Sequence, residues 1–143
     1  MICIIDYELG NVVSVQNAAR KLGYDCKISR DESVISNSDA IILPGVGSFD
    51  PAMKNLEQAN LVKCLQSWSA NNKPLLGICL GLQLLFESSE EGGSKGLGLL
   101  KGHIQKLPQE KGERIPHMGW SPLKFKKHCP LIEEKDQTNW MYF

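Results

Sequence analysis

Short apolar runs alternate with longer amphipathic stretches over the first part of the chain. Four runs are each expected to form a buried strand: 2–5, 24–28, 40–43 and 74–79. Helical spacing of apolar residues predicts helices over 11–22, 49–70 and 81–87, the second of them broken near 55–60. Such alternation predicts βαβ units. We therefore expect an α/β fold with a flavodoxin-like, doubly wound and mostly parallel sheet.

Glycine and proline positions indicate where the predicted elements end. Gly23 follows the first helical stretch as its expected C-cap, and Pro44-Gly45 is expected to stop the third strand. From Gly92 onward, glycine and proline interrupt the chain every few residues, which predicts small strands and loops in this half. The chain has 143 residues, a length typical of one domain, so residues 1–143 are expected to form a single domain.

Charge and cysteine content exclude several classes of protein. Sixteen basic residues balance sixteen acidic ones, so net charge gives no reason to expect a nucleic-acid or membrane partner. The five cysteines are odd in number and lack C-x-x-C spacing, which argues against a disulfide framework or a zinc site and for a reducing compartment. No apolar run is long enough to span a bilayer, and the first residues are predicted to form a buried strand instead of a signal peptide. We expect a cytoplasmic protein without metal or cofactor.

The clearest chemical signal is the segment Gly77-Ile78-Cys79-Leu80-Gly81, which lies between a predicted strand and a predicted helix. A sharp strand-to-helix turn of this kind exposes its central side chain as a nucleophile, and small residues on both sides prevent a clash. At a helix N-terminus the thiolate of Cys79 is favoured, and the Leu80 N–H can meet a developing oxyanion. A buried cysteine in a tight βα turn is the alternative interpretation of this short pattern.

Two further segments are less specific on their own. Pro44-Gly45-Val46-Gly47 ends the third strand and could supply a second oxyanion donor, although an ordinary βα loop also explains its glycines. His117-Met118-Gly119-Trp120 lies in a loop bounded by proline and glycine. Exposed aromatic side chains and methionine of this kind are typical of interface anchors, and a tryptophan buried under a loop is the alternative.

Taken together and in this order, five segments resemble the triad-type glutamine amidotransferases. The segments are DYELGN, LPGVGSF, GICLGLQLLFE, GLGLLKG and PHMGWS. Within that family the sequence is most similar to the glutaminase subunit of imidazole glycerol phosphate synthase, an enzyme of histidine biosynthesis. The resemblance covers essentially the whole chain.

The resemblance implies a role for each matching residue. Cys79 would attack the side-chain amide of L-glutamine and form a thioester. The Leu80 N–H and the strand Gly45-Val46-Gly47 would form the oxyanion hole, and Gln83 and Glu91 would bind glutamine. In the family this oxyanion strand is thought to be misoriented until the partner is engaged. The loop His117-Met118-Gly119-Trp120 would face that partner, a (β/α)8 barrel cyclase that receives the ammonia.

Departures from the family pattern keep other interpretations open. Glu8 stands where the family usually has glycine, and Ser121 where asparagine is usual. The family's Phe-His-Pro-Glu motif, which carries the catalytic His and Glu, does not occur in this sequence, and neither His103, His117 nor His128 matches it. We therefore expect an amidotransferase domain incomplete at its C-terminus and a 143-residue chain that is inactive by itself.

Two alternative functions follow from these departures. The chain could be a truncated or non-catalytic homologue, which lacks a base to return the proton to ammonia. It could also be a related glutaminase subunit that feeds the amidation of a polysaccharide sugar.

Overall fold

The computed structural model describes residues 1–108, 115–124 and 140–143. These residues form two compact units, residues 1–106 and residues 107–143, each of which is described by itself. Within the described ranges, no helix has both the length and the apolar character needed to cross a membrane.

A four-stranded parallel sheet forms the centre of the first unit, in the order β2-β1-β3-β4. Its strands are β1 (Ile2–Ile5), β2 (Cys26–Ser29), β3 (Ala40–Gly45) and β4 (Leu75–Cys79). The α/β fold with a mostly parallel sheet is therefore confirmed. From β1 the chain adds β2 on one side and then β3 and β4 on the other, so the switch point of the topology lies between β1 and β3. In open α/β sheets, ligands bind at this point, outside the carboxyl ends of the strands.

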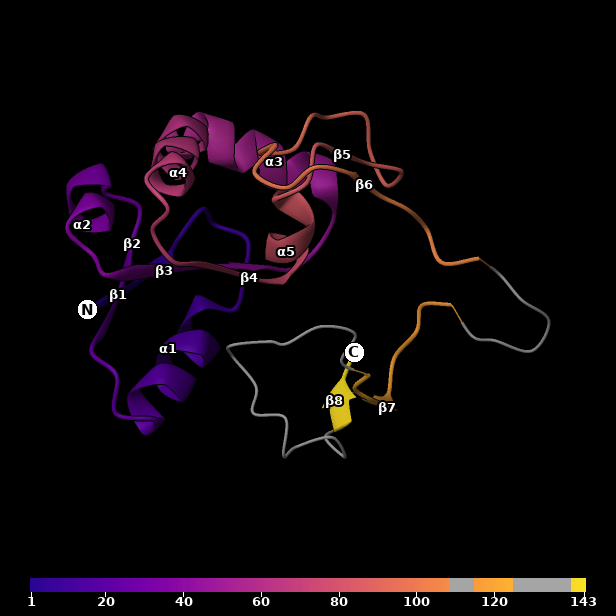
Figure 1. The fold of residues 1–143 in the computed structure, drawn as a ribbon, viewed down its shortest axis with the longest axis horizontal. Coiled ribbons are helices and arrows are strands. Elements are labelled where there is room, and N and C mark those ends of the chain that lie inside the picture. The colour runs from indigo at the N-terminus through magenta and orange to yellow at the C-terminus, as the bar shows by residue number, and fades with distance from the viewer. Residues whose placement is uncertain (109–114, 125–139) are drawn as a thin grey trace. The chain divides into compact units, whose positions relative to one another are not determined.

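Helices cover both faces of this sheet. Figure 1 shows α1 (Val12–Lys21) on one face. The helices on the other face are α2 (Glu32–Ser36), α3 (Phe49–Gln58), α4 (Leu61–Ala70) and α5 (Leu80–Leu84). The larger apolar cluster lies between the sheet and this second set of helices, and a smaller one lies beneath α1.

Local signals account for most helix ends. The Asn11 side chain accepts a hydrogen bond from the Ser14 N–H and begins α1, and Gly23 follows it with a left-handed φ of 84°. The predicted helix over 49–70 breaks at Asn60, which has a φ of 57°. Helix α2, which begins at the N-cap Asp31, was not predicted. Helix α5 is shorter than the predicted 81–87.

The expected stop of the third strand at Pro44-Gly45 is wrong, because β3 continues through Gly45 and pairs it with Cys79. The pairing of β3 with β1 ends at Ile42. A proline at position 44 therefore removes no hydrogen bond from that ladder, while the pairing with β4 continues.

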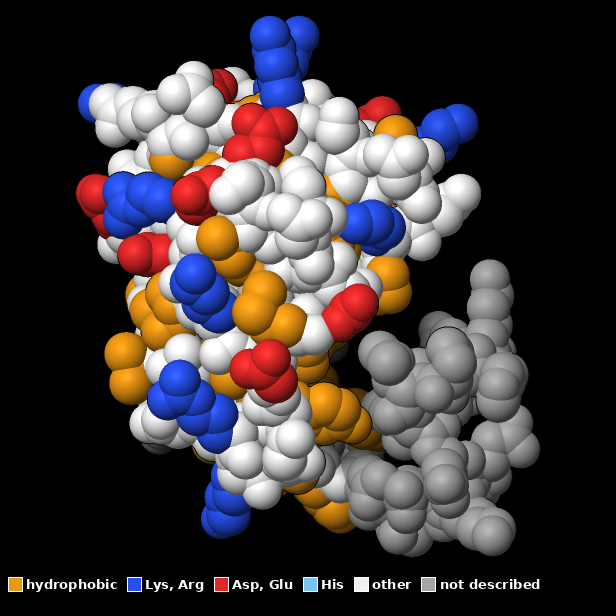
Figure 2. Space-filling view, turned by 90° about the vertical axis from the view of Figure 1, so that its left-hand side faces the viewer, with side chains coloured by type: hydrophobic (Ala, Val, Ile, Leu, Met, Phe, Trp, Pro, Cys, Tyr) orange, Lys and Arg blue, Asp and Glu red, His pale blue; other side chains and the backbone are white. Residues whose placement is uncertain are grey.

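The remaining strands are short, and those after Gly92 agree with the small strands predicted for that half. Strands β5 (Ser88–Ser89) and β6 (His103–Ile104) pair in parallel in the first unit. In the second unit, β7 (Trp120–Pro122) and β8 (Trp140–Tyr142) pair antiparallel. Figure 2 shows basic and acidic side chains interspersed over one face of the molecule, as the balanced charge implies.

Candidate active site

Cys79 lies where β4 ends and α5 begins, at the carboxyl edge of the parallel sheet. Its backbone has a φ of 55° and a ψ of −119°, a conformation that residues other than glycine rarely adopt. Holding a residue there costs on the order of 1–3 kcal/mol, and such strain concentrates at functional sites. Its side chain is exposed. The predicted strand–turn–helix with an outward-facing thiol is therefore present.

Close backbone packing explains the two glycines around Cys79. A Cβ atom at Gly77 would lie 2.6 Å from the Cα of Leu82. At Gly81 it would lie 1.8 Å from the carbonyl oxygen of Leu43. Both distances are far shorter than any real carbon contact, so α5 can pack against β3 and β4 only because these positions have no side chain.

The segment Gly45-Val46-Gly47 lies next to the Cys79 turn. A Cβ at Gly45 would lie 2.7 Å from the backbone N of Gly81, so the two glycines pack directly against each other. Gly47 has a φ of 100°, which only glycine adopts without strain. Val46 and Gly47 are exposed beyond the end of β3. The tertiary fold thus places both predicted oxyanion segments at one edge of the sheet.

Tyr7 is a residue near this edge that sequence reasoning did not select. Its side chain is buried, and its hydroxyl has no hydrogen-bond partner among the described residues. A Cβ at Gly45 would lie 2.6 Å from that hydroxyl oxygen. Burial, and to a smaller extent the charge of Cys79, raise the pKa of Tyr7 above its usual value. A neutral, buried hydroxyl therefore packs against Gly45, the residue of β3 that pairs with Cys79. No pattern in the sequence predicts this contact.

The two predicted glutamine-binding residues have different surroundings. Gln83 is half-buried in α5, one turn beyond Cys79. Glu91 is exposed, and its carboxylate accepts a hydrogen bond of 3.3 Å from the Phe49 N–H. Phe49 is the first residue of α3 and follows the segment 45–47 after one residue. Glu91 therefore contacts the same loop that carries the second predicted oxyanion segment.

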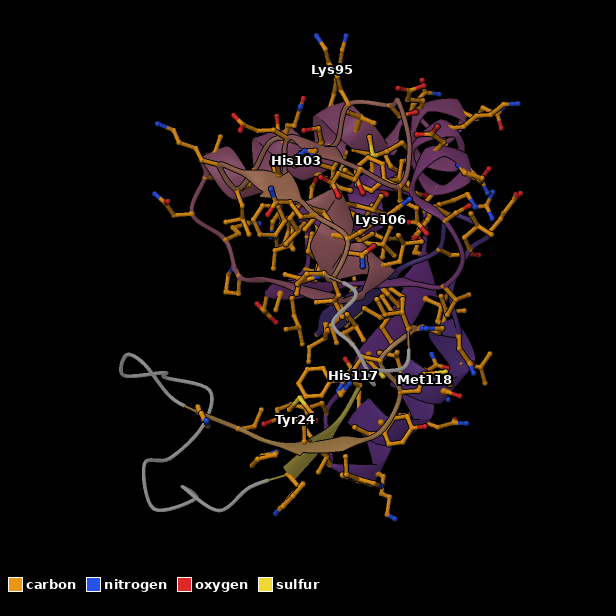
Figure 3. All side chains as sticks on the ribbon, turned by 90° about the vertical axis from the view of Figure 1, so that its right-hand side faces the viewer. Tyr24, Lys95, His103, Lys106, His117 and Met118 are labelled. Carbon is orange, nitrogen blue, oxygen red and sulfur yellow. The ribbon has the colours of Figure 1, made fainter. Side chains whose placement is uncertain are left out.

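The two described histidines hydrogen-bond to residues other than Cys79. His103 Nδ1 lies 2.8 Å from the Ser88 hydroxyl, and its Nε2 lies 3.9 Å from a Glu90 carboxylate oxygen. His117 Nε2 lies 3.1 Å from the Ser121 hydroxyl. Figure 3 labels His103 in the β6 region and His117 in the second unit. His128 lies outside the described residues. Within residues 1–106, no hydrogen bond joins Cys79 to a histidine.

The second unit presents aromatic and apolar side chains to solvent. Met118 is 70% exposed and Trp120 is 66% exposed. The Trp120 and Tyr142 rings meet edge to face across the β7–β8 pair, with centroids 5.6 Å apart. Within this unit, the loop from His117 to Trp120 has the composition of an interface anchor, and Trp120 is exposed instead of buried under the loop.

The cysteines differ in accessibility. Cys3, Cys26 and Cys64 are buried, and only Cys79 is exposed among the four that lie in the described ranges. Burial raises the pKa of the Cys3 and Cys64 thiols, which makes their reactive thiolate forms scarcer. Cys129 lies outside the described residues.

Comparisons with known proteins agree with this geometry. The chain is 58% identical over 140 residues to the imidazole glycerol phosphate synthase subunit HisH 2 of Prochlorococcus marinus strain MIT 9313. It is 59% identical to the HisH subunit of the same species, strain SARG, and 51% identical to that of Synechococcus sp. strain CC9902. Each match covers 98% of this chain, and the chain spans 66% of each relative's length.

A solved structure and a family match complete the comparison. A crystal structure described as a glutamine amidotransferase has a TM-score of 0.66 at 17% identity, covering 85% of this chain and 63% of that one, and so shares the fold. Residues 3–142 match the family Glutamine amidotransferase class-I. Since this match takes in Cys79 and its strained turn, and relatives above 50% identity cover nearly all of the sequence, the chain belongs to the class-I glutamine amidotransferases.

Proposed function

We propose that this chain is the glutaminase part of an imidazole glycerol phosphate synthase. The Cys79 thiolate attacks the side-chain amide carbon of L-glutamine. The amide nitrogen takes up the proton that the thiol lost, the C–N bond breaks, and ammonia leaves. Water then attacks the γ-glutamyl thioester, which releases glutamate and returns the thiol. The ammonia passes to a (β/α)8 barrel cyclase.

One observation carries this proposal: an exposed cysteine in a strained strand-to-helix turn, within a sequence whose relatives are named as HisH subunits. The Cys79 side chain is exposed, so its own packing does not account for the strain. It is explained if the thiol must stand clear of the sheet edge to reach a substrate carbonyl.

Neighbouring groups are proposed to complete the site. The Leu80 N–H and the peptide groups of Gly45-Val46-Gly47 stabilise the oxyanion, because both segments end at the carboxyl edge beside Cys79. Gln83 and Glu91 hold the amino-acid end of glutamine. Backbone donors of this kind contribute roughly 10²–10³-fold to the rate of acyl transfer.

The second unit is proposed to face the cyclase through the loop His117 to Trp120. Large exposed aromatic side chains and methionine are the residue types enriched in the centres of protein interfaces. The family match spans residues of both units, which supports treating them as parts of a single amidotransferase domain.

A second proposal, that residues 1–143 by themselves are non-catalytic, is favoured by the hydrogen bond of His103. His103, the described histidine of the first unit, is held by the Ser88 hydroxyl and is not hydrogen-bonded to Cys79. A base is needed to take the thiol proton and return it to ammonia, which typically contributes about 10²–10⁴-fold. A polypeptide of residues 1–143 is therefore proposed to be inactive by itself, and one continued through the family's Phe-His-Pro-Glu motif to be active.

The test is glutamate release from glutamine, measured with and without a cognate cyclase. The continued polypeptide should release glutamate faster with the cyclase, and Cys79→Ala should abolish that release. Absence of Cys79-dependent release would refute the glutaminase proposal. Partner-stimulated release by residues 1–143 would refute the proposed inactivity.

A further inference from the structure

Two segments more than forty residues apart in sequence are joined by reciprocal hydrogen bonds. The Asp50 carboxylate accepts from the Gly93 N–H at 3.1 Å and from the Ser94 N–H at 2.9 Å, one bond on each oxygen. In the opposite direction, the Glu91 carboxylate accepts from the Phe49 N–H. We call this set of contacts, made by residues 49–50 and 91–94, the clasp.

The clasp leaves no room for an extra atom. A Cβ at Gly92 would lie 2.1 Å from an Asp50 carboxylate oxygen, so a side chain at this position would displace the carboxylate from its present place. The Glu91 N–H is held as well, since it donates to the buried Ser89 hydroxyl at 3.1 Å. The backbone is therefore fixed on both sides of Glu91.

The clasp connects two parts of the proposed active site. Phe49 and Asp50 begin α3, directly after the loop that carries Gly47, and Glu91 is one of the two proposed glutamine-binding residues. The Ser48 side chain makes no cap hydrogen bond, so the Glu91 carboxylate takes the place of a cap at this helix end. Any displacement of residues 91–94 would move both Glu91 and the start of α3.

We propose that Asp50 is a positioning residue, which holds Glu91 at the start of α3 by binding the main chain of the loop that follows Glu91. The inference rests on the proposed glutaminase function. A carboxylate that accepts two N–H groups forms charge-assisted bonds, which are shorter and stronger than neutral ones. Hydrogen bonding by Ser94, through its N–H and then its side chain, and after that by the Gly93 N–H holds the pKa of Asp50 below its usual range, so the carboxylate stays charged.

Asp50→Asn breaks the clasp from one side. Asparagine has one acceptor oxygen, and its NH2 group would face a main-chain N–H, so one hydrogen bond is lost and two donors oppose each other. Gly92→Ala breaks the clasp from the other side without changing charge, because its Cβ displaces the carboxylate. The matched control is Glu57→Gln, since Glu57 is an exposed acidic residue on the same helix, outside the clasp.

The experiment uses the complete protein together with its cyclase. Asp50→Asn and Gly92→Ala should each lower kcat/KM for glutamine at least about 10-fold, mainly through a higher KM, because a binding group has been misplaced. Glu57→Gln should match the wild type. Labelling of Cys79 by a glutamine-mimicking electrophile should slow in parallel with kcat/KM, while alkylation by iodoacetamide should stay within about twofold of wild type.

Several outcomes would overturn the inference. Wild-type KM in either folded clasp variant would do so, and so would an equal loss in Glu57→Gln. Slower iodoacetamide alkylation, in step with the loss of activity, would show a general disruption of the site instead of a misplaced Glu91. The two variants act from opposite sides, so one remains informative if the other fails to fold. A wild type without Cys79-dependent glutaminase activity would refute the proposed function and this inference with it.

Discussion

Gly81→Ala should separate the two segments that meet beneath the candidate nucleophile. The added Cβ would lie 1.8 Å from the Leu43 carbonyl oxygen and 2.8 Å from the Leu43 carbonyl carbon. Both partners are backbone atoms of a central strand, so no side-chain rotation can relieve the clash. The start of α5 and the end of β3 must therefore move apart by about 1 Å, and overpacking of this kind costs about 1–3 kcal/mol.

The same movement should reduce activity far more than stability. Gly81 follows Cys79 and Leu80, so a displacement of about 1 Å changes the position of the thiol relative to the proposed oxyanion donors and should cost roughly 10²-fold in rate. The assay is glutamate release by the polypeptide continued through the Phe-His-Pro-Glu motif, measured with the proposed cyclase partner and paired with urea unfolding to measure the free energy of unfolding.

Gly23→Ala is the matched control. Gly23 has a φ of 84° and open space around its Cα, so alanine there adds backbone strain of about 1 kcal/mol at the end of α1, remote from Cys79. It should lose stability and keep activity. A Gly81→Ala enzyme with activity within a few-fold of wild type would refute the reasoning, because the two backbones would then tolerate a side chain between them.

Three further predictions follow from the described residues. Cys79 should be alkylated first among the described cysteines in native protein, since the others are buried; mass spectrometry that finds one of those modified earlier would contradict this. Glu8→Gly should raise the free energy of unfolding by about 0.5–1 kcal/mol, because Glu8 has a φ of 71° and its exposed ion pair with Arg30 contributes little; a loss above about 1 kcal/mol in urea titrations would refute it. The pKa of Asp50 is lowered in the folded state, so its contribution to the free energy of unfolding is present above its unfolded pKa of about 3.9 and is lost as pH falls through the folded pKa. The free energy of unfolding should therefore decline less steeply below about pH 4 in Asp50→Asn than in wild type. Equal declines in the two proteins would be inconsistent with the clasp.

Local order along the chain was largely predictable. The first strand, the helix begun by Asn11 and the Cys79 turn each depend on neighbouring residues, and each was found where the pattern indicated. Helix α2 was missed although Asp31 caps it, because five residues are too few to show a helical period. The extension of β3 through Pro44 was also missed, since it depends on where the pairing with β1 ends.

The sequence by itself determined the α/β alternation, the exposed-nucleophile turn and the glycine positions, because these follow from side-chain period and from short-range backbone sterics. Only the tertiary structure decided which segments meet. Gly45 contacts Gly81 because the sheet order places β3 beside β4, and Asp50 binds the main chain beyond Glu91 because α3 and that loop converge at one end of the sheet. Contacts between residues so far apart depend on the packing of whole elements, and no local pattern encodes them.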